Sequence, residues 1–361
     1  MIVFFCDSIN SNTGWSSYLH NIYKCLNNKK RIIIICHKIN KTIKVKQYPL
    51  LRHPLDYSNN PFLIFIDIFK VIFFLKRSNY NFLNLHIICE PYVLFLPFIY
   101  KFFKKNFLTA HGSYSLILNY SLRTKFFFKI ALRFINQVIY VSEYTREKLY
   151  IIYNSNHIKK VVIDNAIEPA KQIKYKVRKK NNFISVGSIK PRKGHHHLIE
   201  SVNNLVNKNC KNFHLTIVGS TDDLNYLKIL KEKIFKYRLE KYISFTGFLE
   251  VSRLRQKMAN AKLFILLSDD FNYQFEGFGL VYLEALNNGL YVVISKKSGF
   301  SNFKIPYNCG IVLKPNNYSE ISNYLKKIVN NKIKINSNNY QFLSEKWYLF
   351  KNRIMSLYQV L

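Results

Sequence analysis

The amino-acid sequence predicts an α/β fold made of two Rossmann-like domains that face an interdomain cleft. Its 361 residues exceed the size at which a single core normally keeps growing, so two domains are expected. Short apolar runs alternate with longer amphipathic stretches along the chain, a pattern typical of parallel sheets covered by helices. Open sheets of this kind bind ligands outside the carboxyl ends of their strands, so we expect a functional site in the loops that follow strands.

The first half of the chain contains the expected strands and helices of one such sheet. Its expected strands are Ile2–Phe5, Ile32–Cys36, Phe82–Ile88, Asn106–Ala110, Val138–Val141 and Val161–Asp164. Its expected helices are Ser16–Leu26, Ser121–Ile135 and Glu143–Tyr153. Two further apolar segments, Pro61–Leu75 and Ile87–Phe103, are broken by charges or prolines before they reach the roughly 20 apolar residues of a membrane span. We expect both segments to be buried or interfacial.

The second half repeats the alternation and supplies the domain boundaries. Its expected strands are Phe183–Val186, His214–Val218, Ile243–Thr246, Leu263–Leu267 and Leu290–Ile294, and its expected helices are His195–Val206, Leu224–Tyr237, Val251–Ala259, Leu280–Asn287 and Tyr318–Val329. The first domain is placed at residues 1–167 and the second at 181–338. Residues 168–180 form the expected linker, because they carry Pro169 and several lysines but little apolar content. Residues 339–361 are expected to form a C-terminal helix that packs back towards the first domain.

The composition favours an anionic partner without identifying it. The chain has 55 Lys and Arg against 20 Asp and Glu, a formal net charge of +35. Such a charge attracts a nucleotide, a nucleic acid or an acidic membrane face. Because the basic residues are spread along a chain that is also rich in Asn, Ile, Lys and Tyr, compositional drift explains the charge equally well.

The cysteines and the N-terminus indicate a cytoplasmic protein. None of the six cysteines forms a CxxC pair, and they lie in apolar runs, which predicts buried thiols in a reducing compartment. The segment Met1–Asp7 has no basic region and turns polar at once, so it is expected to be a first strand instead of a signal peptide.

The strongest local motif runs from Glu276 to Glu284, with the sequence EGFGLVYLE. It follows an expected strand and opens an expected helix. Gly277 and Gly279 let the backbone approach a ligand closely, and the free N–H groups at a helix start favour phosphate. Taken alone, a glycine-rich helix cap with two solvated glutamates explains this motif equally well.

A basic turn joins another strand to a helix at Val186–Gly194, with the sequence VGSIKPRKG. Arg192 and Lys193 can neutralise a diphosphate at the same edge of the sheet, although a solvated basic turn is the alternative. Two further strand-end loops, Val218–Ser220 and Thr246–Phe248, are expected to line the cleft where a nucleotide base lies.

The order of these pieces, SVGSIKPRKGHHHLIES, LTIVGS, ISFTGF and EGFGLVYLEAL, resembles the retaining glycosyltransferases of family 4 (glycosyl transferases group 1), which have the GT-B fold. Weaker matches in the first half are Thr13-Gly14, Thr109–Ser113, Val141–Tyr144 and Asp164–Ile167. The resemblance runs from near residue 1 to about residue 315. It implies that the first domain binds the acceptor and the second binds a nucleotide sugar.

The resemblance implies four catalytic residues. Glu276 holds hydroxyls of the donor sugar. Lys193, with help from Arg192, stabilises the departing phosphate. His111, in a strand-end loop of the first domain, faces the reacting sugar.

The resemblance also implies contacts with the donor. These fall on Gly14, Gly187, Ser188, Gly219, Gly247, Phe248, Gly277, Phe278, Gly279, Leu280 and Glu284, with Glu284 gripping the ribose. Three positions depart from the family pattern. Ser188 stands where the family often has arginine, the first loop has one glycine where two are usual, and Ser298-Gly299-Phe300 replaces a late glycine pair.

The expected reaction transfers a hexose, mannose or another, from a UDP- or GDP-sugar to a glycan or lipid-linked acceptor, in surface polysaccharide or lipopolysaccharide synthesis. The loop Ser268–Phe275 resembles users of GDP-mannose, while UDP-sugars remain open. No metal or cofactor is expected, because no aspartates form an Asp-x-Asp pair and the consecutive residues His195–His197 fan around a helix.

Two alternatives from other classes remain open, and the intact glutamate–glycine motif argues against both. One is a nucleotide-sugar epimerase on the same fold, and the other is a basic nucleic-acid- or membrane-binding protein with a degenerate site; no nucleic-acid partner is expected. The stretch Arg123–Arg133 mixes aromatic and basic residues, and can dock on an anionic inner membrane face as a peripheral protein or simply bury its phenylalanines against the sheet.

Overall fold

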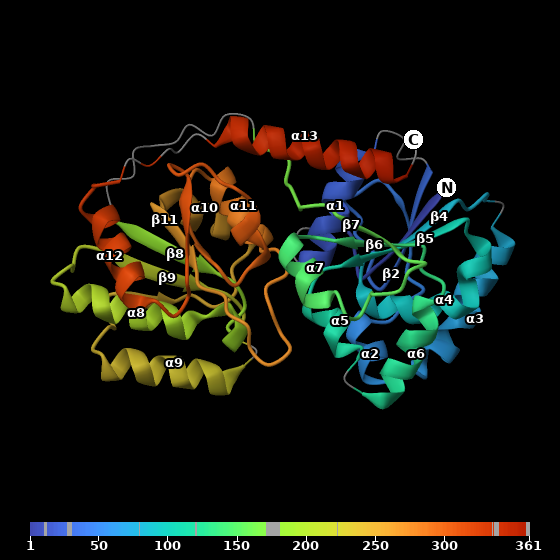
Figure 1. Cartoon of the computed structure of the whole chain (residues 1–361), viewed down its shortest axis with the longest axis horizontal. Coiled ribbons are helices and arrows are strands. Elements are labelled where there is room, and N and C mark those ends of the chain that lie inside the picture. The colour runs from blue at the N-terminus through green and yellow to red at the C-terminus, as the bar shows by residue number, and fades with distance from the viewer. Residues whose placement is uncertain are drawn as a thin grey trace. The chain divides into compact units, whose positions relative to one another are not determined.

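A computed structural model describes residues 1–10, 13–26, 31–78, 80–119, 121–170, 181–221, 223–333, 335 and 339–358 (Figure 1). The chain divides into two compact units. Unit 1 consists of Met1–Ala166 and Tyr348–Leu361, and unit 2 of Ile167–Trp347. Most of the expected linker, residues 171–180, lies outside the described residues.

Unit 1 is built on a seven-stranded sheet with the order β3-β2-β1-β4-β5-β6-β7, in which the neighbouring strands pair in parallel. The strands are β1 (Ile2–Cys6), β2 (Ile32–Cys36), β3 (Lys46–Tyr48), β4 (Asn84–Ile87), β5 (Lys105–Ala110), β6 (Gln137–Tyr140) and β7 (Lys159–Val162). The helices are α1 (Gly14–Cys25), α2 (Pro54–Asn59), α3 (Leu63–Arg77), α4 (Leu96–Ile99), α5 (Ser113–Ile117), α6 (Leu122–Leu132) and α7 (Glu143–Leu149). The strand order reverses between β1 and β4, which is the position where such sheets bind ligands.

Unit 2 has a six-stranded parallel sheet with the order β10-β9-β8-β11-β12-β13. Its strands are β8 (Asn182–Val186), β9 (His214–Val218), β10 (Ile243–Phe245), β11 (Leu263–Leu266), β12 (Tyr291–Ser295) and β13 (Gly310–Leu313). Its helices are α8 (His195–Asn207), α9 (Leu224–Lys236), α10 (Val251–Asn260), α11 (Leu280–Asn287) and α12 (Tyr318–Val329). The long helix α13 (Tyr340–Leu357) begins in unit 2 and ends in the C-terminal segment of unit 1.

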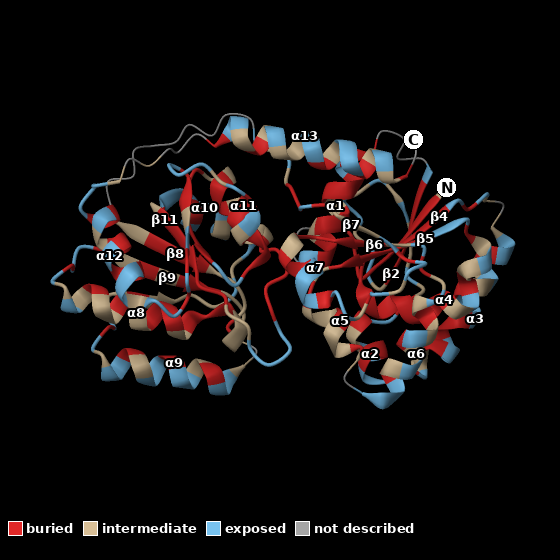
Figure 2. Cartoon of the chain, in the orientation of Figure 1, coloured by how far each residue is buried: buried red, intermediate tan, exposed pale blue. Residues whose placement is uncertain are grey.

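Strands β1 and β2 of unit 1 and strands β11 and β12 of unit 2 are buried along their whole length, as Figure 2 shows in red. Strand β2 is four isoleucines and a cysteine, all buried. A parallel sheet covered on both faces needs such continuous apolar runs, which explains why the sequence pattern located these strands. The six cysteines are free and buried, as expected from their apolar surroundings.

The structure confirms the fold class and adds elements that the pattern did not predict. The pattern did not predict strand β3, which has three residues that are exposed or half-buried, or strand β13, in which only the two end residues are buried. Strand β7 begins two residues earlier than expected. The segment expected to be buried or interfacial at Pro61–Leu75 contains helix α3, which has both a buried and an exposed apolar face. Among the described residues, no helix is long and apolar enough to cross a membrane.

Candidate functional site

The predicted residues of the second half gather at one edge of the unit 2 sheet. Strand β8 pairs with β9 on one side and with β11 on the other, so the strand order reverses there. Open α/β sheets bind ligands at such a point, beside the loops that follow the two diverging strands. The basic turn follows β8, and the glutamate–glycine motif follows β11.

Three predicted glycines form a row along this edge. Gly187 donates its N–H to the Val218 carbonyl at 2.9 Å, and Gly219 donates to the Gly247 carbonyl at 3.0 Å. A Cβ on Gly219 would lie 1.9 Å from the Gly187 carbonyl oxygen, so no larger residue fits there. Ser188 follows Gly187 and is half-buried, and Phe248 follows Gly247 and is exposed.

Gly194 allows the basic turn to pack closely against the end of β11. The turn Pro191–Lys193 is a short 3₁₀ segment, and Gly194 at φ 67° caps the start of α8. A Cβ on Gly194 would lie 1.7 Å from the Leu267 carbonyl oxygen, so only glycine allows this approach. The approach brings the side chain of Lys193 past Gly187, whose own added Cβ would lie 3.3 Å from the lysine stem.

Both predicted cations form ion pairs with the carboxylate of Glu276. Lys193 Nζ and Arg192 Nη1 each lie 2.6 Å from Glu276 Oε2. Burial alone would raise the pKa of Glu276, but the positive charges of Lys193 and Arg192 outweigh burial and lower this pKa to about 2. Burial lowers the pKa of Lys193, and the carboxylate offsets part of that effect. Glu276 is therefore ionised at neutral pH.

The three charges of this cluster leave a surplus of one positive charge in a mostly buried place. Two cations share one carboxylate oxygen, and Lys193 and Glu276 are both buried. A buried charge without a full complement of partners is costly, and an anion that binds the two cations relieves that cost. The cluster is thus suited to an anionic ligand such as a phosphate group.

The glutamate–glycine motif opens α11 as the sequence predicted. Gly279 adopts φ 90° as the residue before the helix, and a Cβ there would lie 2.7 Å from the ring of Tyr282. Phe278 points into the core, where its ring packs edge-on against Phe300 and Phe303. The core packing of Phe278 and the close approach of Gly279 to Tyr282 therefore fix the backbone that opens α11.

The last member of the motif, Glu284, lies one helical turn after Leu280. Its side chain is half-buried, and burial raises its pKa above the ordinary value. The positive charge of Arg255 opposes part of this rise in the pKa of Glu284.

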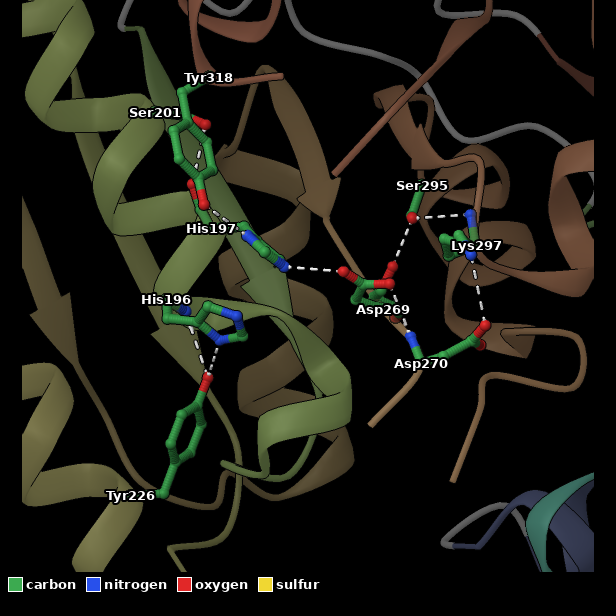
Figure 3. A network of polar contacts seen from close by, with 10 residues as sticks. His196, His197, Ser201, Tyr226, Asp269, Asp270, Ser295, Lys297 and Tyr318 are labelled. Atoms are coloured by element: carbon green, nitrogen blue, oxygen red, sulfur yellow. Dashed lines mark hydrogen bonds and ion pairs between the residues drawn. The ribbon is translucent and has the colours of Figure 1, made fainter. Parts of the chain in front are cut away.

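A hydrogen-bond network that the sequence did not reveal supports the same loops (Figure 3). His197 on α8 lies 3.1 Å by its Nε2 from Asp269 Oδ2, and 3.0 Å by its Nδ1 from the Tyr318 hydroxyl. Asp269 in turn donates its backbone N–H to the Arg192 carbonyl at 3.1 Å. The network joins the loop after β11 to the basic turn. The run of three histidines at the start of α8 is the sequence signal of this network.

The predicted residues of unit 1 lie around a buried carboxylate. Glu90 Oε1 accepts from the His111 backbone N–H at 2.8 Å, and Oε2 accepts from Trp15 Nε1 at 2.7 Å. Gly14 lies beside Trp15 at the start of α1, with open space where a Cβ would stand. Sequence reasoning missed Glu90, although a lone acid in the apolar run Ile87–Phe103 was a usable signal.

Burial sets the protonation of this unit 1 group. It lowers the pKa of His111 to about 3, so the imidazole is neutral, and its Nε2 is buried with no hydrogen-bond partner among the described residues. It raises the pKa of Glu90 to about 7. A neutral imidazole with an unused nitrogen can donate or accept one hydrogen bond to a ligand.

One group of potential metal ligands occurs among the described residues, and it belongs to unit 1. The ligand atoms of Cys6, Asp7 and Cys89 lie within 4.8 Å of one another, and all three residues are buried. Burial raises the pKa of both thiols, which keeps them protonated. The three consecutive histidines of α8 form no such group.

Comparisons with known proteins agree on the fold. Residues 166–342 match the family model of glycosyl transferases group 1. The crystal structure of HepE from Anabaena in complex with UDP and glucose superposes with a TM-score of 0.74 at 19% identity, covering 100% of this chain and 99% of HepE. The apo form of the lipopolysaccharide outer core galactosyltransferase WaaB gives a TM-score of 0.69 at 17% identity, with 99% of each chain covered.

A curated relative is also similar in sequence. An uncharacterized glycosyltransferase of Methanocaldococcus jannaschii is 25% identical over 228 residues. The match covers 63% of this chain and 59% of the relative, so the chain spans less than two thirds of that relative's length.

Proposed function

Since residues 166–342 form a glycosyl transferases group 1 domain on a GT-B fold, we propose that this protein is a glycosyltransferase that uses a nucleotide sugar. It transfers a hexose to an acceptor hydroxyl and retains the configuration at the anomeric carbon. The observation that carries the proposal is the cluster of Arg192, Lys193 and Glu276 at the point where the strand order of unit 2 reverses.

The donor is a UDP- or GDP-sugar, with its diphosphate on the basic turn and its sugar at Glu276. The surplus positive charge of the cluster supports an anionic group at this place. The similarity to HepE, which was crystallised with UDP and glucose, favours a UDP-sugar, while the loop Ser268–Phe275 keeps GDP-mannose as the second choice. The exposed ring of Phe248, at the end of the glycine row, is the surface on which we place the base.

Catalysis rests on charge stabilisation. As the bond from the anomeric carbon to the diphosphate oxygen breaks, negative charge grows on the leaving diphosphate. Lys193 and Arg192 stabilise that charge without a metal ion, and the leaving phosphate accepts the proton of the acceptor hydroxyl. Glu276 then exchanges part of its cation contacts for sugar hydroxyls. In unit 1, the neutral ring of His111 is available for one hydrogen bond to a ligand.

The acceptor is a glycan or a lipid-linked sugar, in the synthesis of a surface polysaccharide or lipopolysaccharide. The likeness to WaaB, a lipopolysaccharide galactosyltransferase, supports this class of acceptor. An epimerase on the same fold is the rival, and it would convert a nucleotide sugar without any acceptor.

A donor screen followed by a single substitution tests the proposal. A thermal-shift screen against UDP, GDP and their sugars identifies the donor, since a ligand that binds only the native state raises the melting temperature. With that donor, Lys193→Ala is expected to lower turnover about 100-fold or more, because it removes a charge aimed at the leaving group. The exposed Lys231→Ala on α9 serves as the control and is expected to keep full turnover.

Two results would contradict the proposal. Turnover of Lys193→Ala within a few-fold of the wild type would remove the basic turn from catalysis. Conversion of the nucleotide sugar at an undiminished rate without any acceptor would favour the epimerase.

A further inference from the structure

Helix α3 of unit 1 is apolar on its exposed face as well as on its buried face, unlike an ordinary surface helix. Its solvent-exposed face carries Phe62 (the residue before the helix), Phe65, Ile66, Phe69 and Phe73. These positions follow the three-and-four spacing of one helical face. Its one acidic residue, Asp67, is instead buried, where Arg52 and Lys70 neutralise it. A soluble surface helix normally places its apolar residues inside and its acids outside.

Helix α6 extends the same exposed surface. Phe127 on α6 packs edge-on against Phe62 and Phe65, with ring centroids 5.7 Å and 6.2 Å away. Its neighbour Phe126 is 62% exposed, and Leu122, one turn earlier on α6, is exposed as well. Phe98 of α4 joins through Phe65 at 5.6 Å. We call the exposed side chains Phe62, Phe65, Ile66, Phe69, Phe73, Phe98, Leu122 and Phe126 the α3–α6 patch.

This finding refines the expectation for the stretch Arg123–Arg133. Phe128 is buried against unit 1, as the alternative of an ordinary helix required, but Phe126 is exposed. Only one side of α6 is therefore available, and α3 supplies most of the apolar surface. A contiguous exposed patch of this kind marks an interaction site in a soluble protein.

The exposed charged residues of α3 and α6 are all positive. Lys76 and Arg77 end α3 on its exposed side, and Arg123 and Lys129 are exposed on α6. The only acid between Phe62 and Arg77 is the buried Asp67, and α6 contains none. The partner of this surface is thus apolar where the rings lie and anionic at the rim.

We propose that the α3–α6 patch binds the surface of an anionic lipid bilayer, with α3 lying flat in the interface. A helix of phenylalanines flanked by Lys and Arg partitions its rings below the headgroups while its cations contact the acidic lipids. At 15 residues α3 is about 22 Å long, shorter than the hydrocarbon core, so it lies on the bilayer and does not cross it. This inference stands apart from the proposed function, since it concerns a surface and not the donor site.

The test is flotation of the full-length protein with vesicles of phosphatidylcholine alone or mixed with phosphatidylglycerol. The wild type is expected to float with the acidic vesicles, and less so at high salt. Phe69→Ser with Phe73→Ser changes two rings that are 73% and 60% exposed, so it is expected to fold normally. It is expected to lower the partition coefficient about tenfold or more, because it removes the two most exposed rings of α3 from the membrane contact.

A matched control exists on helix α9 of unit 2. Leu224→Ser with Phe235→Ser removes two side chains that are 70% and 77% exposed on a helix with no such patch, and it is expected to leave flotation unchanged. A second pair, Lys76→Glu with Arg77→Glu, is expected to weaken binding to the vesicles that contain phosphatidylglycerol and to leave binding to pure phosphatidylcholine vesicles unchanged. Lys193→Ala is expected to float like the wild type, which separates this inference from the proposed function.

Three outcomes would overturn the proposal. The first is a wild type that does not float with acidic vesicles. The second is flotation that the Phe69→Ser, Phe73→Ser variant does not reduce. The third is a wild-type dimer, seen by analytical ultracentrifugation, that this variant dissociates, because the patch would then be covered by a second copy of the chain.

Discussion

At the scale of single residues, the cluster around Glu276 contains two cations although Ser188 stands where the family often has arginine. Lys193 and Arg192 both reach Glu276 Oε2 at 2.6 Å, so the second cation comes from the turn itself. The sequence predicted all three residues because their spacing to strands and glycines is regular. It missed Glu90 and the His197–Asp269 pair, since a buried hydrogen bond between distant segments leaves no local pattern.

The ion pairs of Glu276 predict a loss of stability in acid. Its pKa of about 2 lies below the ordinary 4.5, so ionised Glu276 stabilises the fold above pH 4.5, and that contribution disappears as the pH falls towards 2. The contribution is roughly 3 kcal/mol at most. Urea unfolding of Glu276→Gln is expected to show a smaller decrease in unfolding free energy over this pH window than the wild type.

The exposed Glu240→Gln is the control for that measurement and is expected to follow the wild type. An equal acid dependence in Glu276→Gln and the wild type would show that the two cations do not hold the carboxylate.

At the scale of elements, the buried strands could be predicted from the sequence, whereas the edge strands β3 and β13 could not. The bounds of α11 and α12 agree with those expected, because α11 begins at a glycine cap and α12 has a regular apolar face. Strand β3 has three partly exposed residues, so it carries no apolar run to recognise. Helix α3 was expected to be buried or interfacial, and its true form, buried on one face and apolar on the other, could not be derived from hydrophobicity alone.

The start of α11 depends on glycine at position 279. Its φ of 90° disfavours any side chain, and a Cβ would lie 2.7 Å from the Tyr282 ring, which is itself fixed by a 2.6 Å hydrogen bond to the Leu266 carbonyl. Gly279→Ala is expected to lower the free energy of unfolding by about 1–3 kcal/mol and to weaken donor binding. Chemical denaturation and donor titration measure the two effects.

Gly14→Ala is the matched substitution at a helix start in unit 1. A Cβ there meets nothing within 4 Å, and its φ is not in the left-handed region. Its unfolding free energy is expected to stay within about 1 kcal/mol of the wild type. If Gly279→Ala were as mild as Gly14→Ala, the strained cap would not be holding the motif in place.

At the scale of the whole molecule, the two units contain different functional features. Unit 2 contains nearly all of the residues that match the group 1 family model, together with the charged cluster, and unit 1 contains His111, Glu90 and the α3–α6 patch. The sequence explains the net charge of +35 equally well by function or by compositional drift. The structure adds two places where we expect an anion to bind, the charged cluster of unit 2 and the α3–α6 patch. The fold class followed from alternation of elements, whereas the donor and the acceptor depend on contacts that no pattern encodes.

The most direct test is calorimetric titration of UDP and of GDP into the wild type, Lys193→Ala and the control Lys231→Ala. We predict that at least one of the two nucleotides binds the wild type and the control alike, and that Lys193→Ala weakens this binding about tenfold or more, because a charge-assisted contact to the diphosphate is lost. Failure of both nucleotides to bind the wild type, or equal affinity in Lys193→Ala, would contradict the claim that the basic turn and Glu276 hold a nucleoside diphosphate.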